Sequence, residues 1–162
     1  MKWIYQKNDV PVRDAGKKVR YKVTPAAYVI PVWQGKILLA RRFQTGYEDG
    51  NYSLVAGHVE RGETFVQCIV RETREEIGII VQPDDLEMVH TMHRKIGKDS
   101  ERVDLFFVTT RWQGEITNCE PHKCDDLLWC DGENLPQNTI PYIAQAVQMI
   151  INDVPYSEHG WR

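Results

Sequence analysis

Runs of apolar, β-forming residues predict a pair of strands near the start of the chain. Residues 23–32 and 36–42 contain AAYVIPV and KILLA, and the Gln34-Gly35 pair between them suits the two-residue turn of a hairpin. Pro31 has no N–H group to donate to a sheet, and it therefore indicates a sheet edge or a bulge.

Polar and glycine-rich stretches separate the remaining apolar runs. Residues 44–51 are rich in Gly, Asp and Asn, which predicts a loop, and residues 52–55 form a short strand after it. Further strands are predicted over residues 86–94 and 103–112, the second with the continuous apolar run of an interior strand. Residues 127–129 add one more short strand.

The spacing of polar and apolar residues becomes that of a helix over residues 65–77. Thr64 and Gln67 form a capping box at its start, and Gly78 stands where a left-handed residue usually ends a helix. At about 100° per residue, the apolar side chains fall in one sector. That sector contains Val66, Ile69, Val70, Thr73 and Ile77.

Three carboxylates, Glu72, Glu75 and Glu76, form a strip along one edge of this apolar sector. Glutamates three and four residues apart on a helix repel one another by a few tenths of a kcal/mol per pair. A cation among them offsets the repulsion, and Mg²⁺ bound by carboxylates together with substrate phosphates is the commonest such partner. The strip therefore predicts a metal site beside a cleft.

A second helix is predicted near the end of the chain. Asn138 or Thr139 is expected to cap it, and Pro141 is expected in its first turn. Its apolar stripe consists of Ile143, Ala146, Val147 and Ile150.

Composition restricts the class of protein. The 162 residues, 42% of them hydrophobic, suffice for one domain with a sizeable core, and no apolar run suits a transmembrane helix or a signal peptide. The formal net charge of −3 argues against nucleic-acid binding through a basic surface. We expect no stable nucleic-acid or membrane partner, so phosphates must be met by a metal and a few Arg and Lys side chains.

The four cysteines fit no obvious disulfide framework, which predicts a reducing, cytoplasmic compartment. Cys119, His122, Cys124 and Cys130 raise the alternative of a zinc site, but their gaps do not follow the paired spacing of structural zinc sites. Cysteines that serve as small apolar residues explain the pattern better.

Residues 57–79 resemble the Nudix box, in which glycines, glutamates and an Arg-Glu pair stand at fixed intervals. Thr73 replaces an aliphatic residue of the pattern, and its hydroxyl can bond back to a helix carbonyl while its methyl group packs. Ala56 replaces a second glycine that usually precedes Gly57. The matching residues are Gly57, Glu63, Arg71, Glu72, Glu75, Glu76, Gly78 and Ile79.

The resemblance implies an α/β fold, the Nudix α/β/α sandwich with a mixed central β-sheet. It extends over about residues 22–152, because a Glu-Pro, Lys-Cys, Asp-Leu, Trp order follows the box in one Nudix subgroup and in this chain. We therefore expect an N-terminal arm over residues 1–21, a Nudix hydrolase domain over 22–152 and a C-terminal tail over 153–162. The arm could dock on the domain or on a second subunit, so a homodimer is compatible with the sequence.

The resemblance also implies a metal site. In the family the box carboxylates bind Mg²⁺, for which Mn²⁺ can substitute, so Glu72, Glu75 and Glu76 are the expected metal ligands and catalytic residues. The backbone carbonyl of Ala56 is expected to be a further ligand, since the family uses a carbonyl at that position.

A general base or extra ligand is expected from a later loop. Glu120 is the candidate, because a late glutamate often has this function in the family, and Asp125 and Asp126 are its rivals. One of the box glutamates could also act as the base.

Substrate contacts are expected from residues outside the box. Arg41 and Arg42 should point to opposite faces of their strand, so one of them can face the cleft and hold a phosphate, and Arg42 is the candidate. The alternative is that both side chains are solvated. Tyr47 in the loop and Tyr142 in the last helix are candidates for contact with the nucleoside.

Other box residues are expected to be structural. In the family, the residues at the positions of Arg71 and Glu63 form a pair that holds the loop against the helix. Gly57 and Gly78 are expected to be structural residues of the box. His58, which follows Gly57 in the loop, is expected to form hydrogen bonds or lie at the surface. His90 and His93 receive no role.

The implied activity is that of an Mg²⁺-dependent pyrophosphohydrolase, which cleaves a diphosphate linkage in a nucleoside triphosphate or related nucleotide to give a nucleoside monophosphate and pyrophosphate. The alternative is a hydrolase of a nucleotide sugar, ADP-ribose or a dinucleoside polyphosphate. Relatives of that kind often carry a marker Pro or Tyr beyond the box, and neither lies between Arg94 and Ile96. A non-catalytic nucleotide-sensing domain and an isomerase of lipid-like diphosphates are further alternatives, and sensing domains typically lose box carboxylates.

Overall fold

The computed structural model describes residues 21–98 and 100–161. The predicted N-terminal arm lies outside the described residues apart from Tyr21. The strands are β1 (Thr24–Trp33), β2 (Lys36–Arg42), β3 (Tyr52–Ser53), β4 (Val55–His58), β5 (Glu87–Ile96), β6 (Ser100–Thr109), β7 (Cys124–Cys130) and β8 (Tyr156–His159). The helices are α1 (Phe65–Ile77), the 3₁₀ turn η1 (Pro83–Asp85) and α2 (Pro141–Ile151).

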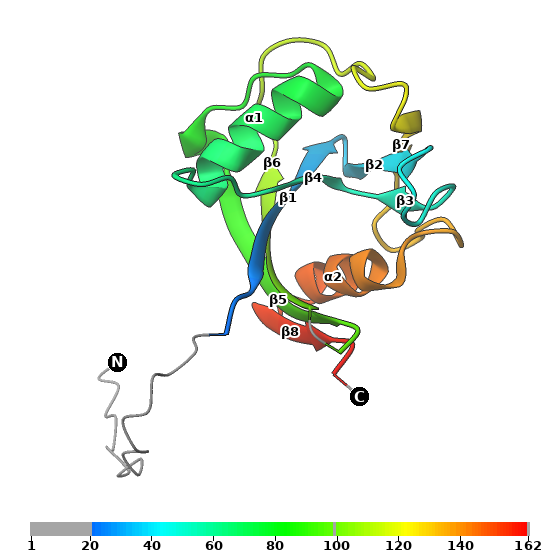
Figure 1. The fold of residues 1–162 in the computed structure, drawn as a ribbon. Coiled ribbons are helices and arrows are strands. Elements are labelled where there is room, and N and C mark those ends of the chain that lie inside the picture. Colours follow the sequence, from blue (N-terminus) through cyan, green and yellow to red (C-terminus); the bar gives the residue numbers. More distant parts are fainter. Residues whose placement is uncertain (1–20, 99, 162) are drawn as a thin grey trace, which may run out of the picture.

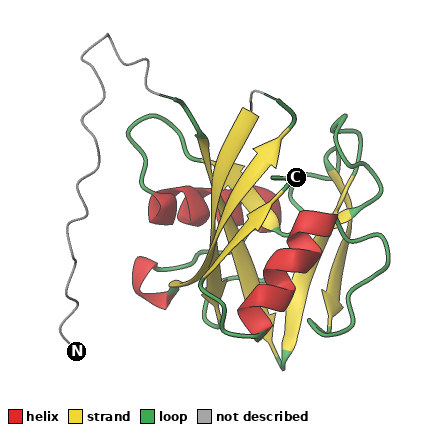
Figure 2. Cartoon of the chain, turned by 90° about the horizontal axis from the view of Figure 1, so that it is seen from below, coloured by secondary structure: helices red, strands yellow, loops and turns green. Residues whose placement is uncertain are grey.

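The strands form one mixed sheet in the order β3-β2-β1-β6-β5-β8, with β4 beside β1 and β7 beside β2. The β1–β6 and β5–β8 pairs are parallel, and the other pairs are antiparallel. Helix α1 lies on one side of the sheet and α2 on the other (Figure 1; Figure 2). The α/β/α sandwich is therefore confirmed.

Strand β1 contributes to both hydrophobic cores, because alternate residues of a strand point to opposite faces. Ala26 and Tyr28 pack in the core that includes α2. Ala27 and Val29 pack in the core that includes α1. The sheet therefore separates two cores that share one central strand.

Both ends of α1 form as predicted. The Thr64 hydroxyl accepts a hydrogen bond from the Gln67 backbone N–H, and the Gln67 side chain accepts one from the Thr64 N–H. Gly78 ends the helix in the left-handed conformation with φ of 73°. The buried Thr73 hydroxyl donates to the Ile69 carbonyl at 2.9 Å. The threonine that departs from the box pattern therefore finds its hydrogen-bond partner within the helix.

Two predictions for the first strands were wrong. The run over residues 52–55 divides into β3 and β4, so Gly57 and His58 lie at the end of a strand and not in a loop. Pro31 lies in an interior strand, between the residues of β1 that pair with β4 and those that pair with β2. Its missing N–H group falls where β1 has no antiparallel partner.

The end of the chain also differs from expectation. Helix α2 begins after Ile140, without a side-chain cap from Asn138 or Thr139. The predicted tail forms β8, which pairs in parallel with β5. The buried His90 holds this region, because its Nδ1 lies 2.7 Å from the Val154 carbonyl oxygen and its Nε2 lies 2.8 Å from the Ser157 hydroxyl. Neither helix in the described part of the chain is long and apolar enough to cross a membrane.

Candidate active site

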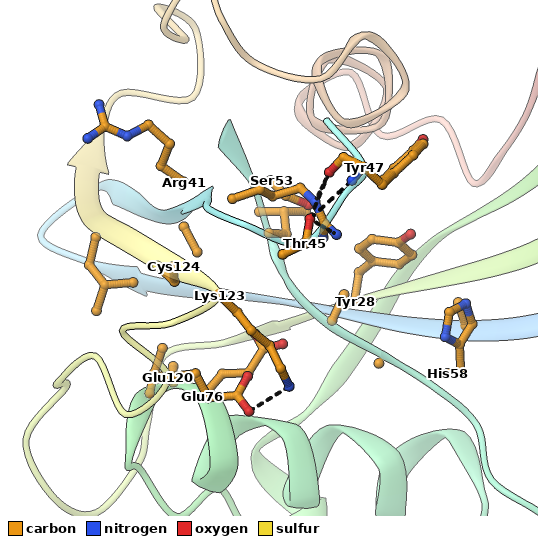
Figure 3. A pocket seen from close by; sticks show the side chains of 18 of the residues that line it. Tyr28, Arg41, Thr45, Tyr47, Ser53, His58, Glu76, Glu120, Lys123 and Cys124 are labelled. Atoms are coloured by element: carbon orange, nitrogen blue, oxygen red, sulfur yellow. Dashed lines mark hydrogen bonds and ion pairs between the residues drawn. The ribbon is translucent and has the colours of Figure 1, made fainter. Parts of the chain in front are cut away.

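A cleft of about 390 Å³ is bordered by β1, β2, β4, the end of α1 and the loop before β7. Figure 3 shows Glu76, Glu120 and Lys123 together on one side of this cleft, while Thr45 and Tyr47 lie on another side. The predicted site residues in its lining are Arg42, Tyr47, Ala56, Gly57, Glu76, Glu120 and Tyr142.

Gly57 brings β4 and α1 into close contact. A Cβ atom at Gly57 would overlap the carboxyl group of Glu72. The neighbouring Ala56 has an ordinary backbone conformation, since its φ is not positive. The alanine at this position therefore imposes no strain, and the glycine that the packing requires is Gly57.

Arg71 connects the segment before α1 to the carboxylate strip. Its guanidinium donates to both carboxylate oxygens of Glu63, at 2.9 and 3.0 Å. It also donates to the Glu72 carboxylate at 2.5 Å and to the Glu75 carboxylate at 3.2 Å. The expected contact between Arg71 and Glu63 is present, and Arg71 fixes Glu72 as well.

The carboxylate strip divides between the cleft and the solvent. Glu76 lines the cleft, and burial, together with the nearby charges of Glu72 and Glu120, raises its pKa to about 8. Burial also raises the pKa of Glu72, although Arg71 acts against this. Glu75 has a 53% exposed side chain and turns toward Arg71, outside the cleft. The structure therefore groups Glu76 with Glu72 and Glu120.

The chemistry of this group suits a hard divalent cation. Three carboxylates supply the oxygen donors that Mg²⁺ and Mn²⁺ prefer, and a buried Glu76 can ionise readily only next to positive charge. In the described residues, no three His, Cys, Asp or Glu side chains stand close enough to share one ion. Glu72 pairs with Arg71, and Glu120 pairs with Lys123 at 2.8 Å. The donor types therefore suit such a cation, while in this structure Glu72 and Glu120 each form an ion pair with a basic side chain.

The rivals of Glu120 have other partners. The Arg41 guanidinium donates to Asp125 at 2.7 Å, and the Tyr52 hydroxyl donates to Asp126. Neither aspartate is in the lining of the cleft. Glu120 is the only one of the three candidates that faces it.

Arg42 holds the loop that follows β2. Its Nε donates to the Tyr47 carbonyl at 2.7 Å and its Nη2 to the Thr45 hydroxyl at 2.9 Å. Asp49 accepts from the same hydroxyl at 2.7 Å, so the loop is internally bonded. Arg41 and Arg42 both contribute to the lining of the cleft, and their side chains bind different partners, Asp125 and the loop.

Tyr142 is a fixed wall of the cleft. Its hydroxyl lies 3.3 Å from the Tyr28 hydroxyl, and its ring centroid lies 3.7 Å from the guanidinium carbon of Arg94. The buried Arg94 donates to Asp104 at 2.7 Å. The second carboxylate oxygen of Asp104 has no hydrogen-bond partner in the described part of the chain. The ring thus rests on a buried ion pair.

His58, Arg102 and Lys123 are among the cleft residues that received no functional role from the sequence. His58 lines the cleft, where burial and the charge of Arg102 lower the pKa of its imidazole. Strand register brings His58 and Arg102 close to each other, because Ala26 and Thr24 of β1 pair with His58 and Arg102, respectively. The Lys-Cys pair of the subgroup pattern was a signal for Lys123.

Comparison with known proteins gives the class of this fold and site. Residues 22–148 match the NUDIX domain model. Among solved structures, the MutT NUDIX hydrolase from Burkholderia pseudomallei has a TM-score of 0.71 at 23% identity, covering 78% of this chain and 97% of that one. The E. coli ORF135 protein has a TM-score of 0.71 at 25% identity, covering 85% and 94%. The chain therefore belongs to the Nudix hydrolase family, and the predicted family, fold class and hydrolase class are confirmed.

Curated relatives include NAD-capped RNA hydrolases. NudC from Stutzerimonas stutzeri (strain A1501) is 30% identical over 115 residues, which are 71% of this chain and 39% of the relative. NudC from Pseudomonas aeruginosa (strain LESB58) is 42% identical over 115 residues, which are 71% of this chain and 38% of the relative. The chain thus spans about two fifths of the length of these relatives.

Proposed function

We propose that the protein is an Mg²⁺-dependent pyrophosphohydrolase, which cleaves a diphosphate linkage in a nucleoside triphosphate or related nucleotide to give a nucleoside monophosphate and pyrophosphate. The observation that carries the proposal is the buried Glu76, which lines the cleft with Glu120 and is affected by the nearby charge of Glu72. A group of carboxylates in a place where anions are disfavoured suits a site that receives a divalent cation and a phosphate chain.

We expect the metal to be held by Glu72, Glu75 and Glu76, with Glu120 as a further ligand or as the base. The backbone of Ala56 forms a hydrogen bond with Glu76, and the N–H and C=O groups of one strand residue leave the strand on the same side. The Ala56 carbonyl is therefore expected to face the same ion. Mg²⁺ or Mn²⁺, when bound, offsets the phosphate charge and makes water a better nucleophile.

The residues of the chain divide the remaining tasks. Arg71 keeps Glu72 in place from outside the cleft. Arg42 retains Nη1 as a donor for a phosphate, since its Nε and Nη2 bind the loop. Tyr47, whose side chain reaches the cleft from that loop, and the fixed ring of Tyr142 are expected to contact the nucleoside. Hydrogen bonds and ion pairs to a phosphate chain would hold it in line for attack by water.

A panel of nucleoside triphosphates, nucleotide sugars and dinucleotides, each with Mg²⁺ or Mn²⁺, tests the proposal. Product identification should show a nucleoside monophosphate together with pyrophosphate from a nucleoside triphosphate. Glu76→Gln is the matched control, because it preserves the shape of the side chain while it removes the charge. Release of orthophosphate alone from nucleoside triphosphates would refute the assignment.

A dinucleotide is the second candidate substrate, because the NudC relatives act on NAD-capped RNA. NAD contains the same diphosphate linkage, and its hydrolysis would give two nucleoside monophosphates without pyrophosphate. NAD and an NAD-capped oligonucleotide in the panel separate the two candidates, since the higher kcat/KM identifies the preferred substrate.

A further inference from the structure

The turn before β7 places Glu120 and Lys123 side by side. The backbone N–H groups of Lys123 and Cys124 donate to the Glu120 carbonyl at 2.8 and 2.9 Å, and the Asn118 side chain donates to the Cys124 carbonyl at 2.6 Å. The Lys123 carbonyl accepts from the Phe43 N–H at 2.8 Å. Hydrogen bonds therefore hold the turn together and connect it to the loop that follows β2.

The Lys123 ammonium faces the group of carboxylates. Its Nζ lies 2.8 Å from Glu120 Oε1, the contact drawn in Figure 3. Glu120 raises the pKa of Lys123 most, and the charges of Glu76 and Glu72 raise it further. One cation of the chain is thus paired directly with Glu120, and the charges of two further predicted metal-site carboxylates act on it.

The other cationic side chains that line the cleft in the described residues have different surroundings. Arg41 binds Asp125, and Arg42 binds the backbone and side chain of the loop. Arg102 lies near His58. Lys123 is the cleft-lining cation that pairs with a predicted metal-site carboxylate.

We propose that Lys123 is an internal counter-cation, which neutralises Glu120 in the metal-free protein and competes with the divalent metal until a substrate phosphate draws the ammonium away. The inference rests on the proposed function, since it assumes that the metal binds at these glutamates. The Lys123 ammonium would then have two positions. Without substrate it pairs with Glu120, and with substrate bound it pairs with the phosphate chain.

The character of the ion pair suits such an exchange. The Lys123 side chain is 55% exposed, and an exposed ion pair contributes little stability. Lysine carries a compact charge on a flexible stem, so the ammonium can move to a phosphate oxygen without a change in the backbone. The turn holds the Lys123 backbone, which limits this motion to the side chain.

Mn²⁺ titration of the purified full chain without nucleotide, followed by calorimetry or by the spectrum of free Mn²⁺, tests the inference. Lys123→Met should bind Mn²⁺ about fivefold more tightly than the wild type, the effect expected of an exposed ion pair near 1 kcal/mol. Lys123→Arg keeps the charge and should return the affinity toward the wild-type value. Lys98→Met removes the same charge from a turn outside the cleft lining and is the matched control.

Equal or weaker Mn²⁺ binding by Lys123→Met, relative to Lys98→Met, would overturn the inference, because a lysine that merely supports Glu120 would give that result. Thermal melting of each variant verifies the fold, and Lys123→Arg provides a second comparison if the methionine variant unfolds. Glu76→Gln should abolish the titration signal. If the signal survived in Glu76→Gln, the proposed metal site itself would be wrong, which is a different outcome from an unchanged Lys123→Met.

Discussion

Gly57 lies against Glu72 so closely that no larger side chain fits at position 57. The backbone of Gly57 has no positive φ, so the requirement is for space and not for conformational freedom. A glycine at a strand interior often marks such a close approach. The position of Glu72 relative to β4 therefore depends on the absence of one methyl group.

Gly57→Ala should displace Glu72 and lower kcat/KM by roughly 100-fold, the loss expected when a catalytic group moves by about 1 Å. The melting temperature should fall by a few degrees, because the overlap strains the contact between β4 and α1. Ala56→Gly, the adjacent change, is the control and should retain most activity. Wild-type turnover in Gly57→Ala would show that the position of Glu72 is unimportant.

Glu76→Gln and Glu75→Gln should differ in severity. Glu76 lines the cleft among other carboxylates, whereas the exposed Glu75 already pairs with Arg71. We expect losses in Mg²⁺-dependent turnover of about 100-fold or more for Glu76→Gln and of about tenfold for Glu75→Gln. Steady-state kinetics over a range of Mg²⁺ concentrations measure both, and full activity in either variant contradicts the role of the carboxylate strip.

The metal-free protein should lose stability as the pH rises. The pKa of Glu76 is raised by burial, and further by Glu72 and Glu120, from 4.5 to about 8. Between these values the folded protein keeps a proton that the unfolded chain releases. The contribution of Glu76 to stability is therefore complete below pH 4.5 and declines toward pH 8, by at most about 1.4 kcal/mol per pH unit.

Urea unfolding at pH 5, 6.5 and 8 in the presence of a chelator measures this slope. Glu76→Gln cannot titrate, so its slope should be smaller, with a remainder due to Glu72, whose pKa is also raised by burial. Addition of Mg²⁺ at pH 8 should recover stability in the wild type more than in the variant. Equal slopes in the two proteins would mean that Glu76 does not titrate in this range.

His90→Ala should loosen β8. The Val154 carbonyl accepts from Nδ1, which leaves Nε2 as an acceptor for the Ser157 hydroxyl. Loss of the buried ring removes both bonds and should lower the free energy of unfolding by about 2 kcal/mol. Hydrogen exchange at residues 156–159 should accelerate. His122→Ala, at an exposed position in the turn before β7, is the control and should have little effect on exchange in β8.

Local signals predicted the elements that depend on neighbouring residues. The capping box at Thr64 and the left-handed Gly78 fixed both ends of α1, because these bonds involve residues within one or two turns. Helical phasing likewise placed Thr73 in the buried sector and Glu76 beside it. Helical phasing alone suggested a metal site at these glutamates, and the family pattern supported the same interpretation.

Other features depend on partners distant in sequence. Asn138 did not cap α2, because its backbone pairs with Tyr52 and its side chain binds the Gly50 carbonyl. The sequence of β8, YSEH, contains no apolar run from which a strand could be predicted. The register of β2 against β7 shifts between Arg41 and Arg42, and strand spacing alone contained no sign of that shift.

The central position of β1 has a consequence for how the protein unfolds. Ala27 and Val29 pack on the side of α1, and Ala26 and Tyr28 pack on the side of α2. Neither layer can separate from the sheet without exposing the shared strand. The two halves of the molecule should therefore melt in one cooperative transition, and the amides of β1 should be among the last in the chain to exchange with solvent.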